Sequence, residues 1–350
     1  MRRFFVLTGM TALFSAALFA QYEDVPSFED TMMVYEDLFG IKEPLVLTLR
    51  FNIKEFKRTK NDEKYHQAEL TCHVDSAFEV KHTVRVRARG KYRRDNCMMP
   101  PYWLNIRYAG IEAEDLADVI KMKVVTRCRG ATAYKDYVLR EYLVYQIYNL
   151  ISPYSFNARL VKLKYIDTGK KNKVTEDWGF IIEPELMMAE RNNCMPIKSD
   201  KLSIRTVNVE WMDKVAYFHY MIGQCDYSVT GRHNLKIITS KEYGPTGFIP
   251  VPYDFDYTGL VDTNYAIPED NLGISSVRER YYLGACRSKE IHQQTIQWLS
   301  SYREEITELI LNFEYMDEKE RLDMVNYLDS YFNEAEGKRF VARSITPTCR

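Results

Sequence analysis

Several features of other protein classes are missing from this sequence of 350 residues. After the first 20 residues it has no apolar run long enough to cross a membrane, and it has no internal repeat or low-complexity segment. The formal net charge is only -1, so electrostatics gives no reason to expect a nucleic-acid partner. With 46% hydrophobic residues, the chain has ample material for a packed core.

Metal-binding patterns of the zinc type are also lacking. None of the seven cysteines forms a Cys-x-x-Cys pair, and the six histidines are scattered, so we expect no zinc site. An odd number of cysteines leaves at least one free or intermolecular, even where disulfides form.

The first 20 residues have the charge, length and order of a secretory signal peptide. Arg2 and Arg3 precede an apolar run that ends in small residues near Ala20. An uncleaved membrane anchor is the alternative. Residues 21–42 are acidic and form a leader segment. We therefore predict a mature chain that is secreted or periplasmic, soluble, and without a transmembrane segment.

A β-rich region is predicted over residues 43–185. Residues 84–89 alternate between apolar side chains and arginines, which indicates a sheet with one basic, wet face. Arg89 ends this strand next to Gly90, where it could contact a phosphate or remain in solvent. No Gly-rich or Walker-type pattern is present to decide between them. The strand-like segments are 45–53, 68–74, 83–90, 102–108 and 119–125.

One long helix and a further hairpin complete this region. The helix is expected from about Tyr134 to Ile151, before Pro153. It carries Glu141, which could pair with Lys123 as kinases pair such residues to hold phosphates, or could form an ordinary exposed pair with its neighbour Arg140. The hairpin comprises strands 157–167 and 178–185, separated by a charged turn. Its exit carries Glu183, either a nucleotide contact or a structural ion-pair partner.

Residues 186–340 are predicted to be mainly helical, around a central hairpin. After a polar linker over 191–203, a helix starts near Trp211, strands follow at 235–239 and 248–252, and two helices span roughly 288–312 and 317–334. If the two strands pair, Asn234 and Asp254 lie side by side, with Asp226 just before them. Pro250 and Pro252 are two apart, so the strand can pair on one side and should be an edge strand.

Carboxylates and a carboxamide at one end of a hairpin would make an oxygen-ligand site for Mg²⁺ or Mn²⁺. Asn234, Asp254 and Asp256 are the candidate metal ligands. Asp226 would stay off the metal as an acid/base group. The alternative is local turn chemistry, because Asp and Asn are common at strand ends.

The order of these segments resembles the spore coat protein H (CotH) kinases, a family of secreted atypical protein kinases. The resemblance covers about residues 45–262 and is carried by VRVRARG, the lysine strand followed by KDYVLREYLVYQIYNLI, ARLVKLKYIDT leading to WGFIIEPE, and the Asp226–Asn234 loop followed by VPYDFDYTG.

The resemblance implies an α+β, bilobal protein-kinase-like fold with a β-rich N-lobe and a mainly helical C-lobe. It further implies ATP with Mg or Mn as cofactors, and a protein hydroxyl as substrate. Asp226 matches the catalytic base, and Asn234 and Asp254 match the metal ligands. Asp256 matches a second ligand or orienting group. Contacts to the nucleotide would come from Lys123, Glu183, Arg89 and Glu141.

This sequence departs from the kinase pattern at three places. The Asp226–Asn234 interval is long, Asp-Phe-Asp replaces the usual triplet that ends in Gly, and the strand after Gly90 continues as Lys-Tyr-Arg-Arg. A catalytically inactive, kinase-like binding module of the cell envelope is therefore the alternative function. A metal-dependent phosphohydrolase that uses the same carboxylates is a third.

Overall fold

The structure is a computed structural model that describes residues 38–73, 79–106, 121–198, 202, 204–242 and 247–350. The predicted signal peptide and most of the predicted leader lie outside this part of the chain. The chain divides into two compact units, residues 1–131 with 158–187, and residues 132–157 with 188–350. The segment 132–157, which carries the long helix expected within the β-rich region, belongs to the second unit.

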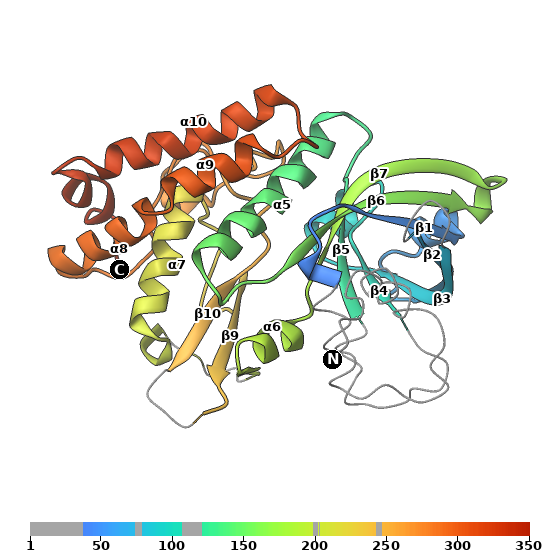
Figure 1. The fold of residues 1–350 in the computed structure, drawn as a ribbon, viewed down its shortest axis with the longest axis horizontal. Coiled ribbons are helices and arrows are strands. Elements are labelled where there is room, and N and C mark those ends of the chain that lie inside the picture. The colour runs from blue at the N-terminus through green and yellow to red at the C-terminus, as the bar shows by residue number, and fades with distance from the viewer. Residues whose placement is uncertain (1–37, 74–78, 107–120, 199–201, 203, 243–246) are drawn as a thin grey trace, which may run out of the picture. The chain divides into compact units, whose positions relative to one another are not determined.

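Seven strands of the first unit form a closed, mixed β-barrel in the order β1-β2-β3-β4-β5-β7-β6 (Figure 1). Neighbouring strands are antiparallel except β1 and β6, whose parallel pairing closes the barrel. The β-rich region is thereby confirmed, and the protein belongs to the α+β class. The strands are β1 (Leu45–Phe51), β2 (His66–His73), β3 (Glu79–Ala88), β4 (Tyr102–Asn105), β5 (Lys121–Thr126), β6 (Ala158–Asp167) and β7 (Lys173–Ile182).

Alternation along the strands fills the barrel. Val84, Val86 and Ala88 of β3 are buried, as the alternating pattern predicts, and their neighbours in sequence carry the arginines. Two short helices, α3 (Ile53–Arg58) and α4 (Tyr92–Asn96), interrupt the strands and were not predicted. The predicted charged turn over 168–177 is too long, because β7 already begins at Lys173.

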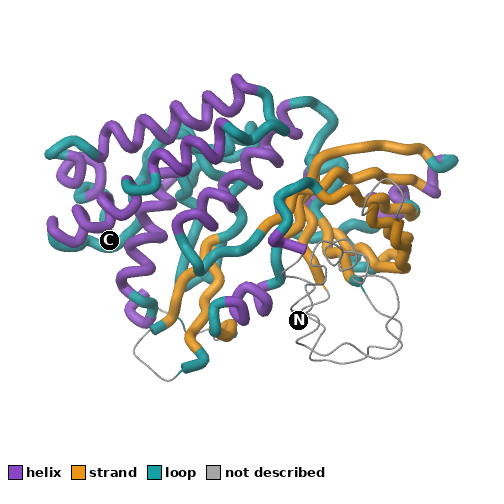
Figure 2. The backbone as a smooth tube through the Cα atoms, in the orientation of Figure 1, coloured by secondary structure: helices purple, strands orange, loops and turns teal. Residues whose placement is uncertain are grey.

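The second unit consists mainly of helices, drawn in purple in Figure 2, and a three-stranded sheet in the order β10-β9-β8. The predicted polar linker over 191–203 contains strand β8, and helix α6, which straddles the boundary between the two units, ends at the first residue of that linker. The elements are α5 (Ala133–Ile151), α6 (Glu185–Arg191), β8 (Cys194–Pro196), α7 (Val209–Ile222), β9 (Leu235–Ser240), β10 (Phe248–Pro252), α8 (Lys289–Ser300), α9 (Arg303–Leu311) and α10 (Glu318–Ala335).

The two central helices have clear sequence boundaries. Helix α5 ends at Ile151, and its cap residue Ser152 directly precedes Pro153. Helix α7 begins where the Asn208 side chain accepts a hydrogen bond from the Trp211 amide at 3.0 Å. It ends at Gly223, whose φ of 70° is the left-handed conformation that favours glycine at this position.

The single helix predicted over 288–312 is wrong, because the chain leaves helical geometry between α8 and α9. The Ser301 hydroxyl donates to the Trp298 carbonyl at 2.7 Å, and Tyr302 has a φ of -99° and a ψ of 6°. A serine that bonds its own backbone competes with the helical hydrogen bonds. No glycine or proline marks this break in the sequence.

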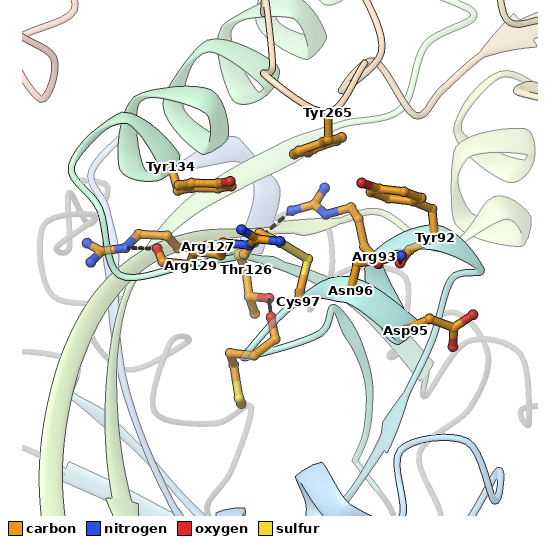
Figure 3. The surroundings of a disulfide bond; sticks show 12 residues. Tyr92, Arg93, Asp95, Asn96, Cys97, Thr126, Arg127, Arg129, Tyr134 and Tyr265 are labelled. Atoms are coloured by element: carbon orange, nitrogen blue, oxygen red, sulfur yellow. Dashed lines mark hydrogen bonds between the residues drawn. A yellow bond between two sulfur atoms is a disulfide. The ribbon is translucent and has the colours of Figure 1, made fainter. Parts of the chain in front are cut away.

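Each unit contains one disulfide. Cys97–Cys128 lies in the barrel unit (Figure 3), and Cys286–Cys349 lies in the helical unit. Cys72, Cys194 and Cys225 are free, which agrees with the odd cysteine count. Among the helices that the structure describes, none has the length and apolar character needed to cross a membrane.

Candidate functional site

The predicted hairpin forms the frame of the site. Strands β9 and β10 pair antiparallel, with Pro252 opposite Leu235, and β10 is at the edge of its sheet. One step beyond, the Tyr253 amide donates to the Asn234 carbonyl at 3.1 Å, so the pairing continues to the end of the hairpin. Asn234 and Asp254 therefore lie at the same end, as the strand pattern predicted.

Both of these residues have a left-handed backbone. The φ angle is 52° at Asn234 and 65° at Asp254. Asn and Asp tolerate this conformation better than most residues, but it still has an energetic cost outside glycine. Strained positions of this kind cluster at binding and catalytic sites. The strain here falls on two residues that the sequence marks as metal ligands.

The long interval between Asp226 and Asn234 folds into a closed turn. Ser228 and His233 exchange two backbone hydrogen bonds, each 3.0 Å long, so the chain doubles back on itself. The turn is further closed by the Gly231 amide, which donates to the Ser228 hydroxyl at 3.0 Å. The additional residues of the interval thus form a turn closed by Ser228 and His233, and this turn brings Asp226 next to Asn234.

Asp226 and Asn234 are in direct contact. The Asn234 Nδ2 donates to the Asp226 carbonyl at 2.7 Å and to its Oδ2 at 3.2 Å. The other carboxylate oxygen, Oδ1, lies 2.9 Å from His233 Nε2. Because the amide nitrogen of Asn234 faces Asp226, the Asn234 oxygen Oδ1 is the atom left for a cation.

A single carboxamide joins Asp226 to the opposite strand of the hairpin. Gln224 Oε1 accepts from the Asp226 amide at 3.1 Å, and its Nε2 donates to the Asp254 carbonyl at 3.2 Å. Gln224 is almost fully buried and follows Gly223, the left-handed residue that ends α7. A side chain added at Gly223 would collide with the Tyr327 hydroxyl, so this turn requires glycine.

The middle residue of Asp-Phe-Asp anchors the triplet in the core. Phe255 is fully buried and packs edge-on against Tyr145 of α5, with ring centroids 4.8 Å apart, and against Phe218 of α7 at 5.9 Å. The Tyr145 hydroxyl accepts a hydrogen bond from the Asp254 amide at 3.0 Å. The ring of Phe255 and the hydroxyl of Tyr145 together fix the position of the Asp254 backbone.

The two carboxylates of the triplet have different surroundings. Asp254 is partly exposed, and its carboxylate has no hydrogen-bond or ion-pair partner among the described residues. Asp256 is buried, and its Oδ2 accepts from the Tyr265 hydroxyl at 3.1 Å. Asp254 is therefore available for a cation, whereas Asp256 already takes part in local structure.

This donor set fits a hard divalent cation that keeps other ligands. Asp254 and the Asn234 oxygen supply a carboxylate and a carboxamide, and Mg²⁺ commonly uses one or two carboxylates together with waters and substrate phosphates. In the part of the chain that the structure describes, no group of three or more His, Cys, Asp and Glu side chains could hold a metal ion. A cation held by Asp254 and Asn234 would therefore need further ligands from outside these two residues.

Two of the predicted nucleotide contacts in the barrel unit, Arg89 and Lys123, lie next to the same aromatic ring. Arg89 and Lys123 both lie over the ring of Trp103, at 5.4 Å and 5.8 Å from its centroid. Lys123 is opposite Ile182 in the β5–β7 pairing, and the buried Glu183 follows Ile182. Lys123 therefore lies in β5 and Glu183 directly follows its neighbour β7, whereas Arg89 follows β3, which β4 separates from β5.

Glu141 belongs to the helical unit and is fully buried in α5. The alternative of an exposed Arg140–Glu141 pair is wrong, because Arg140 is also buried. Its guanidinium binds Glu320 at 2.5 Å and Asp323 at 2.8 Å, both in α10. These carboxylates lie 180 residues or more away in sequence, so neighbouring residues gave no sign of them.

A pocket of about 160 Å³ adjoins Asp226. Asp226, Cys225 and Glu269 contribute polar groups to its lining, and the rest is largely apolar. Burial raises the pKa of the Cys225 thiol to about 11, so this thiol is protonated at neutral pH and is a poor nucleophile. The apolar lining residues come from one loop and include Ile267, Pro268, Leu272, Ile274 and Val277.

Sequence reasoning missed three residues of the site, namely Gln224, His233 and Tyr145. Gln224 acts through backbone hydrogen bonds, and Tyr145 reaches the site from a distant helix, so neither leaves a signal in the sequence. His233 immediately precedes Asn234, and that position was the available clue.

Comparison with known proteins assigns no function to these residues. The sequence matches no model of a known protein family and no curated protein.

Proposed function

We propose that this chain is an extracytoplasmic, metal-dependent kinase that transfers the γ-phosphate of ATP to a hydroxyl group of a protein. The observation that carries the proposal is the end of the β9–β10 hairpin. There, Asp226 is hydrogen-bonded to Asn234, and the Asp254 carboxylate is left without a partner in a left-handed backbone. These residue types occur in the order that kinases use for the base and the two metal ligands.

In this proposal the residues have separate roles. Asp254 and Asn234 Oδ1 would hold Mg²⁺ or Mn²⁺, and the bound cation would neutralise charge on the phosphates. Asp226 would orient the acceptor hydroxyl and receive its proton. His233 and Asn234 hold one carboxylate oxygen of Asp226 each, so the carboxylate has a fixed direction.

We further propose that Lys123, Arg89 and Glu183 of the barrel unit contact the nucleotide. What supports this step is that Lys123 and Arg89 share one aromatic ring and that Glu183 adjoins the strand partner of Lys123.

The proposed compartment agrees with the cysteine chemistry. Two disulfides form among the described residues, and disulfides persist mainly in oxidising compartments. A secreted or periplasmic location also agrees with the predicted signal peptide.

Nucleotide binding and phosphate transfer test the proposal separately. The protein without residues 1–20 should show a rise in melting temperature with ATP and Mn²⁺ together, and Asp254→Asn should abolish that rise. Asp226→Asn should retain the rise and lower transfer of labelled γ-phosphate to an acceptor protein by about 100-fold or more. Asp262→Asn is the matched control, because Asp262 is also left-handed at φ 55° but pairs with Arg278 instead. Absence of any shift in the wild-type protein would contradict the proposal.

One observation favours the alternative of an inactive, kinase-like binding module. Both carboxylate oxygens of Asp226 already have neighbours, and Asp256 accepts from Tyr265, which leaves Asp254 as the open carboxylate of the site. This alternative predicts nucleotide binding that depends on Asp254 without any transfer that depends on Asp226.

A further inference from the structure

The barrel unit has a pocket of its own, distant in sequence from the hairpin site. Its volume is about 280 Å³, close to the lower end of the range for small-molecule sites, about 300 Å³. Its lining includes the buried residues Ile53, Thr126, Cys128 and Tyr165. It also includes Met99 and Trp178, which are partly exposed, and Met98, which is exposed.

The walls of this pocket are held in place covalently and by hydrogen bonds. The Cys97–Cys128 disulfide fixes one wall, and Cys128 itself lines the pocket. Arg93 donates to the Thr126 carbonyl at 2.7 Å, and the Thr126 hydroxyl donates to the Met99 carbonyl at 2.9 Å (Figure 3). A pocket that is already ordered loses less conformational freedom when a ligand binds.

Most charges around the pocket are already satisfied. Arg127 forms an ion pair with Asp177 at 3.3 Å and also donates to backbone carbonyls of the Arg129–Gly130 turn. The nearby carboxylate of Asp167 accepts from the backbone amides of Ile53 at 3.0 Å, Lys54 at 3.4 Å and Gly169 at 2.9 Å. Asp177 is therefore already paired, and the Asp167 carboxylate is held by backbone amides.

Lys57 is the exception. It lines the pocket at the end of α3 and has no hydrogen-bond or ion-pair partner among the described residues. Although the residue as a whole is exposed, desolvation of its ammonium group lowers its pKa, and the like charges of Lys170 and Lys173 lower it further, whereas the charge of Asp167 raises it. A bound anion would relieve the repulsion among the lysines, and in the described part of the chain Lys57 has no direct partner that such an anion would have to displace.

We propose that this pocket binds a small organic anion, with a carboxylate at Lys57 and an aromatic or alkyl body against Met99, Tyr165 and Trp178. The apolar lining matches the body of such a ligand, and a charge-assisted hydrogen bond to Lys57 would fix its head. This site does not depend on the proposed phosphate transfer, because none of its lining residues belongs to the hairpin site.

The probe for this proposal is 2-naphthoate, with its neutral amide 2-naphthamide and inorganic phosphate as comparisons. Titration calorimetry of the protein without residues 1–20 should show binding of naphthoate. The amide should bind with an affinity at least about tenfold lower, because it lacks the charge that Lys57 recognises. Naphthoate should also quench the fluorescence of Trp178, and Trp178→Phe should remove that quenching.

Variants of α3 separate a specific contact from general attraction to a basic surface. Lys57→Gln should weaken naphthoate binding by about tenfold, and Lys57→Arg should largely restore it. Lys54→Gln is the matched control on the same helix and should leave binding unchanged, since Lys54 does not line the pocket. Equal affinities for naphthoate and naphthamide, equal effects of the two Gln variants, or full competition by phosphate would each overturn the proposal.

Discussion

Two sets of arginines, one in each unit, have their positive charge compensated in different ways. In the barrel, the guanidinium groups of Arg85 and Arg87 lie over the ring of Tyr65, at 5.0 Å and 4.9 Å from its centroid. In the helical unit, buried Arg140 binds two carboxylates directly. An aromatic ring attracts a cation without cancelling its charge, whereas a carboxylate cancels it. Arg85 and Arg87 thus keep their charge, whereas Arg140 links α5 to α10.

The largest expected change in the free energy of unfolding comes from removing the disulfide of each unit. Replacing Cys286 and Cys349 by serine should lower the free energy of unfolding by about 4 kcal/mol, because the bond closes a loop with a sequence separation of 63. The corresponding change at Cys97 and Cys128, with a separation of 31, should cost about 0.6 kcal/mol less. Urea unfolding followed by circular dichroism measures both. A much larger difference would show that the units depend on their disulfides unequally.

The next largest effect tests the carboxylate-bound arginine. Arg140→Met should destabilise the protein by about 3 kcal/mol, because the buried guanidinium links α5 to two carboxylates of α10, of which Glu320 would lose this partner and Asp323 would keep only Arg278. Urea unfolding at pH 7 measures this cost. Lowering the pH to protonate the two carboxylates should narrow the gap between variant and wild type. A loss of less than about 1 kcal/mol would show that the Arg140 ion pairs contribute no more than ordinary surface ion pairs.

A buried histidine of the helical unit gives a smaller effect that depends on pH. His219 is fully buried, neither ring nitrogen has a hydrogen-bond partner among the described residues, and burial lowers its pKa from 6.5 to about 3. Below pH 6.5 the unfolded chain binds a proton that the folded chain does not, so stability is lost as the pH falls toward 3.

From pH 7 to pH 5, the free energy of unfolding of the wild type should fall by about 2 kcal/mol more than that of His219→Phe. Phenylalanine keeps an aromatic ring against Tyr227, whose centroid lies 4.2 Å from that of His219. Urea midpoints at the two pH values measure the difference. Between pH 7 and pH 8 the two proteins should respond alike, and identical responses below pH 6 would show that His219 is accessible to protons in the folded state.

The smallest effect tests the arginines that lie over aromatic rings. Arg87→Met should cost about 1 kcal/mol or less, since the guanidinium is partly exposed and loses only its contact with Tyr65. Tyr65→Leu with Arg87 intact should cost a similar amount, and the double variant should cost less than the sum. If Arg87→Met were as costly as Arg140→Met, the contrast between the units would fail.

Local patterns predicted most individual elements but not their assembly. Alternation identified the strands of the barrel, and the position of Pro153 marked the end of α5. Closure of the barrel depends on the parallel pairing of β1 and β6, which begins with Leu45 opposite Val161. A contact between residues more than a hundred positions apart leaves no periodicity in either segment. The break between α8 and α9 was missed because its residues keep the helical spacing of apolar side chains.

The candidate site was predictable where adjacent residues build it. The strands β9 and β10 determine that Asn234 and Asp254 lie at one end, so their positions followed from the hairpin. The contact between Asp226 and Asn234 needed the closed Ser228–His233 turn, and backbone bonds of this kind are not encoded by a distinctive residue pair. Asp256 was expected near the metal, but its hydrogen bond to Tyr265 could not be foreseen from its position beside Phe255.

The barrel is discontinuous in sequence, and this affects how the protein can be made. During synthesis the ribosome completes β1 to β5, then the whole of α5, and only then the two strands that close the barrel. Until β6 and β7 emerge, β1 and β5 are unpaired edges, which are the parts of a sheet most prone to join other chains. A fragment that stops at residue 131 would keep those edges permanently, so neither unit can be expressed as one uninterrupted piece of the chain.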